Sequence, residues 1–217
     1  MSDDVLLLEK IIPGDQMWAV EDYRERARLM GNTVKDLAIL YLEDRSGDNS
    51  ENEKYPTYLS WMEDLRAKLI DMWDLEDILF YLDKAIETYK ELKQHHNKKC
   101  LLHGDLHQEN MLLNEKGDYT IIDPKGVVDD PVMETARFLL NEIPCKKSKI
   151  LEMAGIMSPV IGISVDDILK SLFVDTALSN CWCMEEHFAT KEAFKETKQN
   201  VLEICRFVYD IINEKSQ

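Results

Sequence analysis

Apolar residues follow a helical spacing along most of the chain. They recur every three or four positions in five stretches, and this spacing lines one face of a helix with apolar side chains. The stretches run from Val20 to Tyr41, Trp61 to Met72, Leu75 to Leu92, Val165 to Phe188 and Phe194 to Ile211. The spacing therefore predicts a mainly helical protein, with helices before and after a central segment of different character.

Residues that often begin or interrupt helices mark the expected boundaries. A Ser, Thr or Asp side chain can accept a hydrogen bond from the first N–H groups of a helix, so caps are expected at Asp74, Asp130, Ser148, Ser164 and Thr190. The proline after Asp130 suits the first helical position. Gly31-Asn32 is expected to interrupt the first helix, and the polar segment 43–54 is expected to form a loop.

Short strand-like runs occupy the centre of the chain. Leu101-Leu102 is a brief apolar pair, and Met111–Leu113 and Tyr119–Ile122 are separated by the turn-forming segment 114–118. Asn, Gly and Asp between two such runs are typical of a β-hairpin. The predicted fold class is therefore α+β, mainly α with a small β-hairpin element.

Composition limits the functions that such a fold can serve. The chain has 217 residues, 45% of them hydrophobic, which is enough for one packed domain without disulfides or metal. Its net charge of −16 argues against a nucleic-acid binder and against adhesion to an anionic membrane, whereas it is compatible with cationic ligands. The start of the chain resembles no secretory leader, and five scattered cysteines form no disulfide framework, so we expect a cytoplasmic location.

One segment carries residue types suited to phosphate chemistry. Residues 103–110 read His-Gly-Asp-Leu-His-Gln-Glu-Asn, and Asp123 follows after the predicted hairpin. The hairpin is expected to return Asp123 to the corner where Asp105 and Asn110 lie, so that two carboxylates and one amide oxygen converge. Mg²⁺ prefers such oxygen ligands, and one carboxylate remains to accept a proton. Phosphoryl transfer from ATP needs this division of roles.

These residues resemble the catalytic segment of the aminoglycoside phosphotransferase family, small-molecule kinases that share the protein-kinase fold. The resemblance rests on His-Gly-Asp-Leu-His-x-x-Asn at 103–110 and Ile-Ile-Asp at 121–123. The continuation Asp-Pro-Lys-Gly-Val-Val-Asp-Asp-Pro at 123–131 is similar to the streptomycin/hydroxyurea-type branch of antibiotic phosphotransferases. The resemblance implies the helical C-terminal lobe of a protein-kinase-like fold.

The resemblance also implies a role for individual residues. Asp105 would be the catalytic base that orients and deprotonates the acceptor hydroxyl. Asn110 and Asp123 would bind Mg²⁺, with the ion at Asp123 bridging the phosphates of ATP. His103 would brace the loop, and Lys125 would meet a phosphate or pair with Asp123.

The first residues are similar to the hinge that joins the two lobes of these kinases and holds adenine. The similarity covers residues 6–14, where Glu9 and Ile11 would offer backbone groups to adenine. Val5–Leu8 has the pattern of a short buried strand that would lack its sheet partners. We therefore expect this strand to fold back, to fray, or to pair with another chain, which would be a second copy or a separate N-terminal lobe.

The whole chain, 1–217, is thus expected to be a single kinase-like C-terminal lobe. Its parts would be a hinge-like strand (1–14), a helical part (15–100), the catalytic loop and hairpin (101–143) and C-terminal helices (144–217). No glycine-rich phosphate loop or strand lysine is recognised in the sequence. The chain alone is expected to turn over ATP weakly or not at all, because these groups supply electrostatic positioning.

Two classes of function remain open. The leading one is ATP-dependent phosphorylation of an alcohol group on a small molecule, with a cationic aminoglycoside such as streptomycin as one candidate. The alternative is a non-catalytic remnant or binding module that keeps the lobe as a scaffold. A metal hydrolase is less favoured, because nothing in the sequence supplies its usual histidine ligands.

Several other groups have a functional and a structural interpretation. His107 could touch substrate, although loop packing explains it better. Glu185-Glu186 and Asp166-Asp167 could line an acidic acceptor site, although a solvated helix face is the better account of each pair. Cys181-Trp182-Cys183 is better explained by core and helix-surface positions than by a metal site, which would need four ligands.

Overall fold

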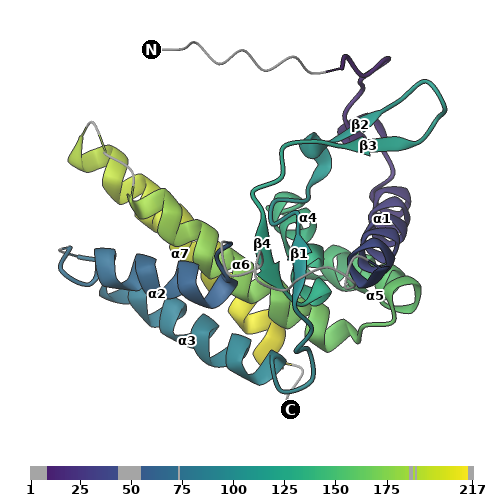
Figure 1. Cartoon of the computed structure of the whole chain (residues 1–217). Coiled ribbons are helices and arrows are strands. Elements are labelled where there is room, and N and C mark those ends of the chain that lie inside the picture. The colour runs from purple at the N-terminus through teal and green to yellow at the C-terminus, as the bar shows by residue number, and fades with distance from the viewer. Residues whose placement is uncertain (1–8, 44–54, 73, 186–187, 189, 215–217) are drawn as a thin grey trace, which may run out of the picture.

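The computed structural model describes residues 9–43, 55–72, 74–185, 188 and 190–214 (Figure 1). The α-helices within these ranges are α1 (Tyr23–Glu43), α2 (Tyr58–Leu69), α3 (Glu76–Leu92), α4 (Ala136–Asn141), α5 (Lys147–Ile161), α6 (Val165–Glu185) and α7 (Lys191–Asn213). Three short 3-10 helices are η1 (Met17–Ala19), η4 (Gln108–Asn110) and η5 (Pro131–Thr135). The mainly helical α+β prediction is confirmed. Val5–Leu8 and most of the predicted loop 43–54 lie outside the described residues.

Helix α6 forms the centre of the helical core. It packs against α2, α3, α4, α5 and α7, and its side chains are buried without interruption from Ser171 to Cys181. Figure 1 shows α7 beside α6, with α2 and α3 near one end of the pair and α1 on the opposite side of the molecule, packed on α5. A helix covered on all sides reads as apolar all round rather than amphipathic, and the sequence of α6 fits that rule.

Four short strands form two antiparallel pairs. In the hairpin, β2 (Met111–Leu113) pairs with β3 (Tyr119–Ile121), with Met111 opposite Ile121. The second pair joins β1 (Cys100–Leu102) to β4 (Val127–Asp129). The predicted hairpin is confirmed, whereas the pairing of β1 with β4 was not predicted. This second pair holds the two ends of the 103–126 segment together.

Helix boundaries follow the expected caps in part. Three of the five predicted caps accept a backbone N–H as expected: Asp130, Ser164 and Thr190. Asp74 is not a cap, because Leu75 occupies the N-cap position and the Asp74 carboxylate accepts a hydrogen bond from Lys198 instead. Ser148 lies inside the first turn of α5, since that helix begins one residue earlier.

The predicted interruption of the first helix is wrong, because α1 continues through Gly31. A Cβ at this position would lie 3.5 Å from the Met157 Cα and from the Val160 side chain of α5. The glycine therefore lies at the contact of α1 with α5, where an added Cβ would be in ordinary van der Waals contact, and it does not break the helix. Among the described helices, none alone is both long and apolar enough to cross a membrane, although α5 and α6 meet that criterion as a pair bent by 115°.

Candidate active site

His103 joins the catalytic loop to the residue that follows the second strand of the hairpin. Its Nε2 donates to the Ile122 carbonyl at 2.9 Å, while Nδ1 accepts from the Asp105 N–H at 3.2 Å. These two bonds require the neutral ring, and burial lowers the pKa of His103, which favours that form. The His103 carbonyl also accepts from the backbone N–H groups of Lys125 and Gly126. His103 thus holds the segments of Asp105 and Asp123 side by side.

The turn after His103 requires glycine. Gly104 has a φ of +76°, and a Cβ there would lie 2.9 Å from Val127 Cγ1 on β4. The Gly104 N–H donates to Glu134 Oε1 at 2.9 Å. Glu134 is buried, and this burial raises the pKa of its carboxyl group to about 7. A buried glutamate therefore fixes the loop that carries Asp105 through the backbone of Gly104.

Three side chains surround the Asp105 carboxylate. Lys125 Nζ lies 3.1 Å from Oδ2, Arg137 Nε lies 3.5 Å from Oδ1, and His107 Nε2 lies 3.9 Å from Oδ1. Burial lowers the pKa of His107, so its ring contributes little positive charge near neutral pH. Lys125 and Arg137 are therefore the cations at this carboxylate. Lys125 was expected to meet a phosphate or to pair with Asp123, whereas its ammonium group pairs with Asp105.

Asn110 connects the two halves of the predicted site. Its side-chain Nδ2 donates to the Asp105 carbonyl at 2.9 Å, and its own carbonyl accepts from the Ile122 N–H at 3.0 Å. Asp123 follows directly with an exposed side chain and a left-handed backbone, with φ +59°. Such a φ is uncommon outside glycine and often marks a functional position. The structure therefore brings the segments of Asp105, Asn110 and Asp123 to one junction.

The donor atoms at this junction suit Mg²⁺. The Nδ2 of Asn110 is engaged with the Asp105 carbonyl, so its amide oxygen is the atom of this side chain that could bind a metal. The exposed carboxylate of Asp123 is the second candidate ligand. Mg²⁺ binds through one or two protein oxygens and completes its shell with phosphate oxygens and water. Within the described ranges, no group of three or more His, Cys, Asp or Glu side chains could hold a metal ion. The Asp123 carboxylate and the Asn110 amide oxygen are of the kind that would fit such a partly hydrated ion.

The two hinge candidates lie elsewhere. Glu9 is exposed and Ile11 is half-buried on the segment that leads to Gly14. This segment runs along β2, because the Gly14 N–H donates to the Leu113 carbonyl and the Leu113 N–H to the Asp15 carbonyl. The segment that carries Glu9 and Ile11 therefore leads to the β2 strand of the hairpin, and none of the contacts above joins either residue to Asp105, Asn110 or Asp123.

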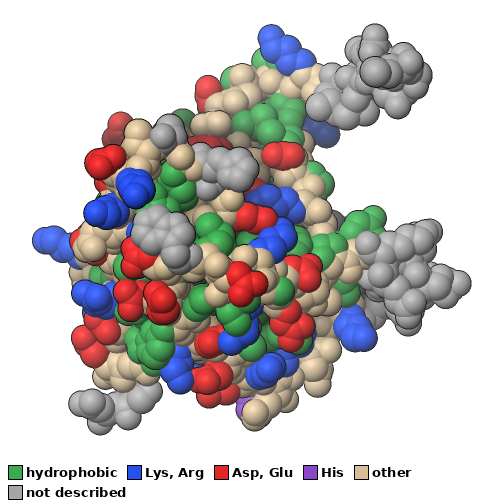
Figure 2. All heavy atoms as spheres, turned by 90° about the vertical axis from the view of Figure 1, so that its left-hand side faces the viewer, with side chains coloured by type: hydrophobic (Ala, Val, Ile, Leu, Met, Phe, Trp, Pro, Cys, Tyr) green, Lys and Arg blue, Asp and Glu red, His purple; other side chains and the backbone are tan. Residues whose placement is uncertain are grey.

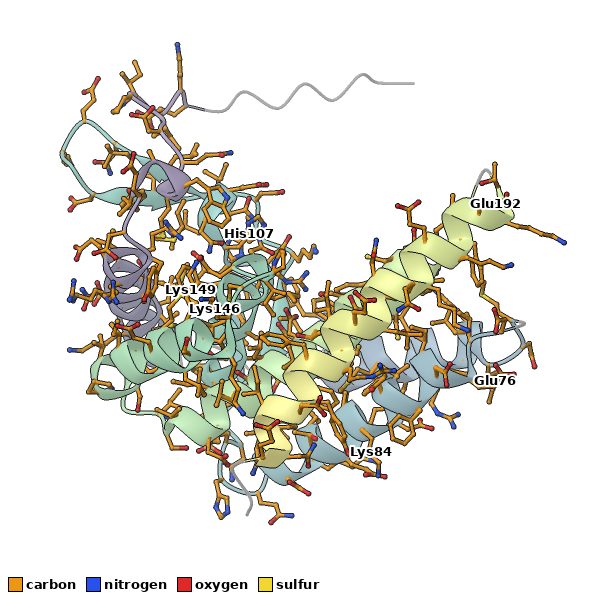
Figure 3. The ribbon with its side chains drawn as sticks, turned by 180° about the vertical axis from the view of Figure 1, so that it is seen from behind. Glu76, Lys84, His107, Lys146, Lys149 and Glu192 are labelled. Atoms are coloured by element: carbon orange, nitrogen blue, oxygen red, sulfur yellow. The ribbon has the colours of Figure 1, made fainter. Side chains whose placement is uncertain are left out.

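A buried charged cluster fixes the other side of the catalytic loop. Gln108 donates to Glu142 Oε1 at 3.0 Å, and the same carboxylate accepts from Arg26 at 2.7 and 2.8 Å and from Lys149 at 2.7 Å. Figure 3 shows Lys149 of α5 below His107 of the loop. Burial alone would raise the pKa of Glu142, but the hydrogen bonds from Arg26 and Lys149 outweigh it and lower the pKa.

Sequence reasoning missed three residues that α4 and α6 bring to the site. Arg137 donates to Asp175 at 2.9 Å, and Lys125 Nζ lies 5.1 Å above the Trp182 ring. Trp61 of α2 meets Trp182 edge-on, with 5.4 Å between ring centroids. One signal was available: Asp175 is a lone carboxylate in an apolar stretch of α6. Trp182 was expected at a core or helix-surface position. It is half-buried on α6, and its ring also lies close to the cations Lys125 and Arg137.

The acidic pairs considered for the acceptor lie outside this junction. Glu185 pairs with Lys68, and Asp166 and Asp167 lie at the opposite end of α6, where they pair with Lys170 and His96. Figure 2 shows acidic and basic side chains interspersed on the face that it presents. The partners of Glu185, Asp166 and Asp167 agree with the structural interpretation of these residues.

Comparison with known proteins places the chain among kinases. A family model described as aminoglycoside/hydroxyurea antibiotic resistance kinase matches residues 2–187, which confirms the resemblance of the catalytic segment. A search of curated protein sequences found no match. Solved structures share the fold at low sequence identity, and two of them are a choline kinase and an ethanolamine kinase.

The choline kinase is from Streptococcus pneumoniae, with a TM-score of 0.60, 13% identity, and coverage of 91% of this chain and 69% of that one. The ethanolamine kinase is from Plasmodium vivax, with a TM-score of 0.58, 12% identity, and coverage of 96% and 68%. An AMP-bound spectinomycin phosphotransferase has a TM-score of 0.50, 16% identity, and coverage of 90% and 70%. At these identities the likeness shows a shared kinase-like fold.

Proposed function

Because the chain belongs to the aminoglycoside/hydroxyurea antibiotic resistance kinase family, we propose that it is a phosphotransferase acting from ATP on an alcohol group of a small molecule. The observation that carries the proposal is the double contact of Asn110, whose side chain binds the backbone of Asp105 and whose backbone binds Ile122. This contact joins the segment of the candidate base to the segments of the two candidate metal ligands, which supports the arrangement that phosphoryl transfer needs.

Each residue then has one task. Asp105 accepts the proton of the acceptor hydroxyl, and Asn110 and Asp123 hold Mg²⁺, which when bound neutralises charge on the phosphates of ATP. Lys125 contacts a phosphate oxygen once it leaves Asp105, and His103 keeps the two segments together. Glu9 and Ile11 offer backbone groups to adenine. Two similar structures, the choline kinase and the spectinomycin phosphotransferase, carry AMP in their solved complexes, which supports nucleotide binding here.

The charge around the base favours a cationic acceptor such as an amino sugar. Arg137 contacts the carboxylates of Asp105 and Asp175, the charges of these two act on Glu134, and the chain carries a net charge of −16. The Trp182 ring already faces the cations of Lys125 and Arg137. Aromatic faces and carboxylates attract ammonium groups, so an acceptor amine has partners beside the base.

Calorimetry with MgATP tests the site directly, with Asp123→Ala as the main variant. We expect the wild type to bind and Asp123→Ala to bind at least about tenfold more weakly, because the metal would lose its carboxylate ligand. Asp118→Ala is the matched control, since it removes an exposed carboxylate from the turn of the same hairpin. Equal binding by wild type and Asp123→Ala, or no binding by either, would contradict the proposed site.

Turnover is measured separately, by ADP release with a panel of amino sugars and amino alcohols. Phosphorylation that disappears in Asp105→Asn, with MgATP still bound, supports Asp105 as the base. Nucleotide binding without transfer to any acceptor would instead favour the alternative of a non-catalytic binding module. The two measurements therefore separate a failed site from a site that binds without reacting.

A further inference from the structure

One buried cation contacts two carboxylates behind the catalytic loop. Arg137 lies in the first turn of α4, and only 13% of its side chain is exposed. Its Nη2 donates to Asp175 Oδ1 at 2.9 Å, and its Nε lies 3.5 Å from Asp105 Oδ1. Asp175 is completely buried in the middle of α6. The Nη2 of the guanidinium group is thus fixed by Asp175 of the central helix, while its Nε faces the candidate base.

The contact with Asp105 is the incomplete one. Arg137 Nε is buried and makes no hydrogen bond within the described structure, although it faces Asp105 at 3.5 Å. A buried donor without a partner carries a desolvation penalty, so a small shift of Asp105 toward Arg137 is favourable. Hydrogen bonds in catalytic sites are often long in the free protein and shorten in the complex. The geometry therefore leaves Arg137 ready to tighten its hold on Oδ1.

Lys125 differs from Arg137 in exposure and in the oxygen of Asp105 that it contacts. Lys125 Nζ contacts the other oxygen, Oδ2, and 44% of its side chain is exposed, so it can leave without loss of buried contacts. Arg137 stays in place, because its side chain is largely buried and bonded to Asp175. The two oxygens of Asp105 are thus divided between a fixed cation and an exchangeable one.

We propose that Arg137, held by Asp175, is the positioning residue that orients Asp105 for the transfer reaction. Arg137 binds Oδ1, which leaves Oδ2 for the acceptor hydroxyl when Lys125 moves away. Arg137 keeps its own proton throughout, and the proton of the acceptor goes to Asp105. This inference rests on the proposed phosphotransferase function. It also explains why a carboxylate is buried in the apolar helix α6, because Asp175 would hold Arg137 in place.

Steady-state kinetics on the full chain test the role. Arg137→Gln should lower kcat by about 10- to 100-fold, because small misplacements of a catalytic group have effects of that size, and should leave the KM for ATP within about twofold. Arg137→Lys should recover part of the loss, since an ammonium cannot span both carboxylates. Adding Asp175→Asn to Arg137→Gln should cause no further loss, because Asp175 acts through Arg137.

The control is Arg28→Gln, which removes an exposed arginine of α1 far from the loop. The role is overturned if Arg137→Gln has the kcat of Arg28→Gln, or if the losses in Arg137→Gln and Asp175→Asn multiply in the double variant. A loss of kcat that vanishes after correction for the folded fraction, measured from the unfolding midpoint, would also overturn it.

A measurement without turnover separates this inference from the proposed function. In the ¹⁵N-labelled full chain, the Arg137 Nε–H resonance should shift in Asp105→Asn and in Asp175→Asn, and should stay in place in Asp118→Asn. A responsive resonance in a protein that phosphorylates nothing would refute the proposed function and keep the Arg137–Asp105 contact. A resonance that ignores Asp105→Asn would refute the positioning role, even in an active enzyme.

Discussion

Two buried glutamates hold the catalytic loop from opposite sides, and their surroundings differ in charge. Glu142 receives hydrogen bonds from Arg26, Lys149 and Gln108, and the pKa of its carboxyl group is lowered despite burial. Glu134 receives the Gly104 N–H, but burial, with the charges of nearby Asp175 and Asp105, raises its pKa to about 7. One carboxylate is matched by cations, and the other lies among carboxylates.

The difference separates a structural cluster from a working site. The Glu142 cluster, defined by Arg26, Gln108, Glu142 and Lys149, sets two cations against one carboxylate, so this carboxylate is fully compensated and helps to fix the loop. The Asp105 cluster, defined by Asp105, Lys125, Glu134, Arg137 and Asp175, has three carboxyl groups and two cations. Unbalanced charge is unfavourable for folding but gives a site affinity for cations and shifts pKa values. The surplus of carboxyl groups in the Asp105 cluster therefore suits a magnesium–nucleotide and a cationic acceptor.

Removing Glu142 should have the largest effect on stability. The Glu142→Ala variant would leave Arg26 buried without its partner, and breaking a buried ion pair in this way lowers the free energy of unfolding by about 3–5 kcal/mol. Urea unfolding measures the loss. Glu152→Ala is the control, because this glutamate also binds an arginine, Arg24, but with 41% of its side chain exposed. An exposed pair contributes about 0–1 kcal/mol, so equal losses in the two variants would refute the view that buried Glu142 depends on its cations.

Glu134 should give the opposite pH dependence from an ordinary paired carboxylate. Its pKa rises from 4.5 to about 7 in the folded chain, so folding favours the protonated form and stability falls as pH rises through that window. Glu134→Gln keeps an oxygen for the Gly104 N–H without ionising. The stability of Glu134→Gln relative to wild type should increase by about 3 kcal/mol across the window.

Urea unfolding at several pH values between 4.5 and 7.5 measures this change. Glu142→Gln is the comparison, because the lowered pKa of Glu142 makes its contribution present above the ordinary pKa of 4.5 and lost as pH falls below it. Parallel stability curves for wild type and Glu134→Gln would show that the Asp105 cluster is balanced after all.

The sequence predicts those parts of the fold that depend on local spacing. The third helix was expected from Leu75 to Leu92 and runs from Glu76 to Leu92, because its apolar face repeats regularly. The hairpin followed from turn residues between two short runs. The cap at Asp74 failed because Lys198, far along the chain, takes its carboxylate. The pairing of β1 with β4 joins residues more than twenty positions apart, and local patterns carry no information on such contacts.

The candidate site divides in the same way. Asp105, Asn110 and Asp123 lie within one motif, so the sequence could select them, although their roles remain proposals. Arg137 and Asp175 come from α4 and α6, and their contact depends on how two helices pack. A lone aspartate in an apolar stretch was the available signal, but its partner could be identified only from the fold.

The smallest effect should come from the exposed cation of each cluster. Lys149→Met removes one of the cations on buried Glu142 and should lower the free energy of unfolding by about 1–2 kcal/mol, as loss of a charged hydrogen bond does. Lys125→Met should lower it by less than about 1 kcal/mol, because its ammonium is nearly half exposed. Its effect should instead appear in MgATP calorimetry, as weaker binding that Lys149→Met does not show. Lys125→Met could instead lower stability as much as Lys149→Met and leave nucleotide binding unchanged. Lys125 would then be a structural partner of Asp105, and the contrast between a structural cluster and a binding site would fail.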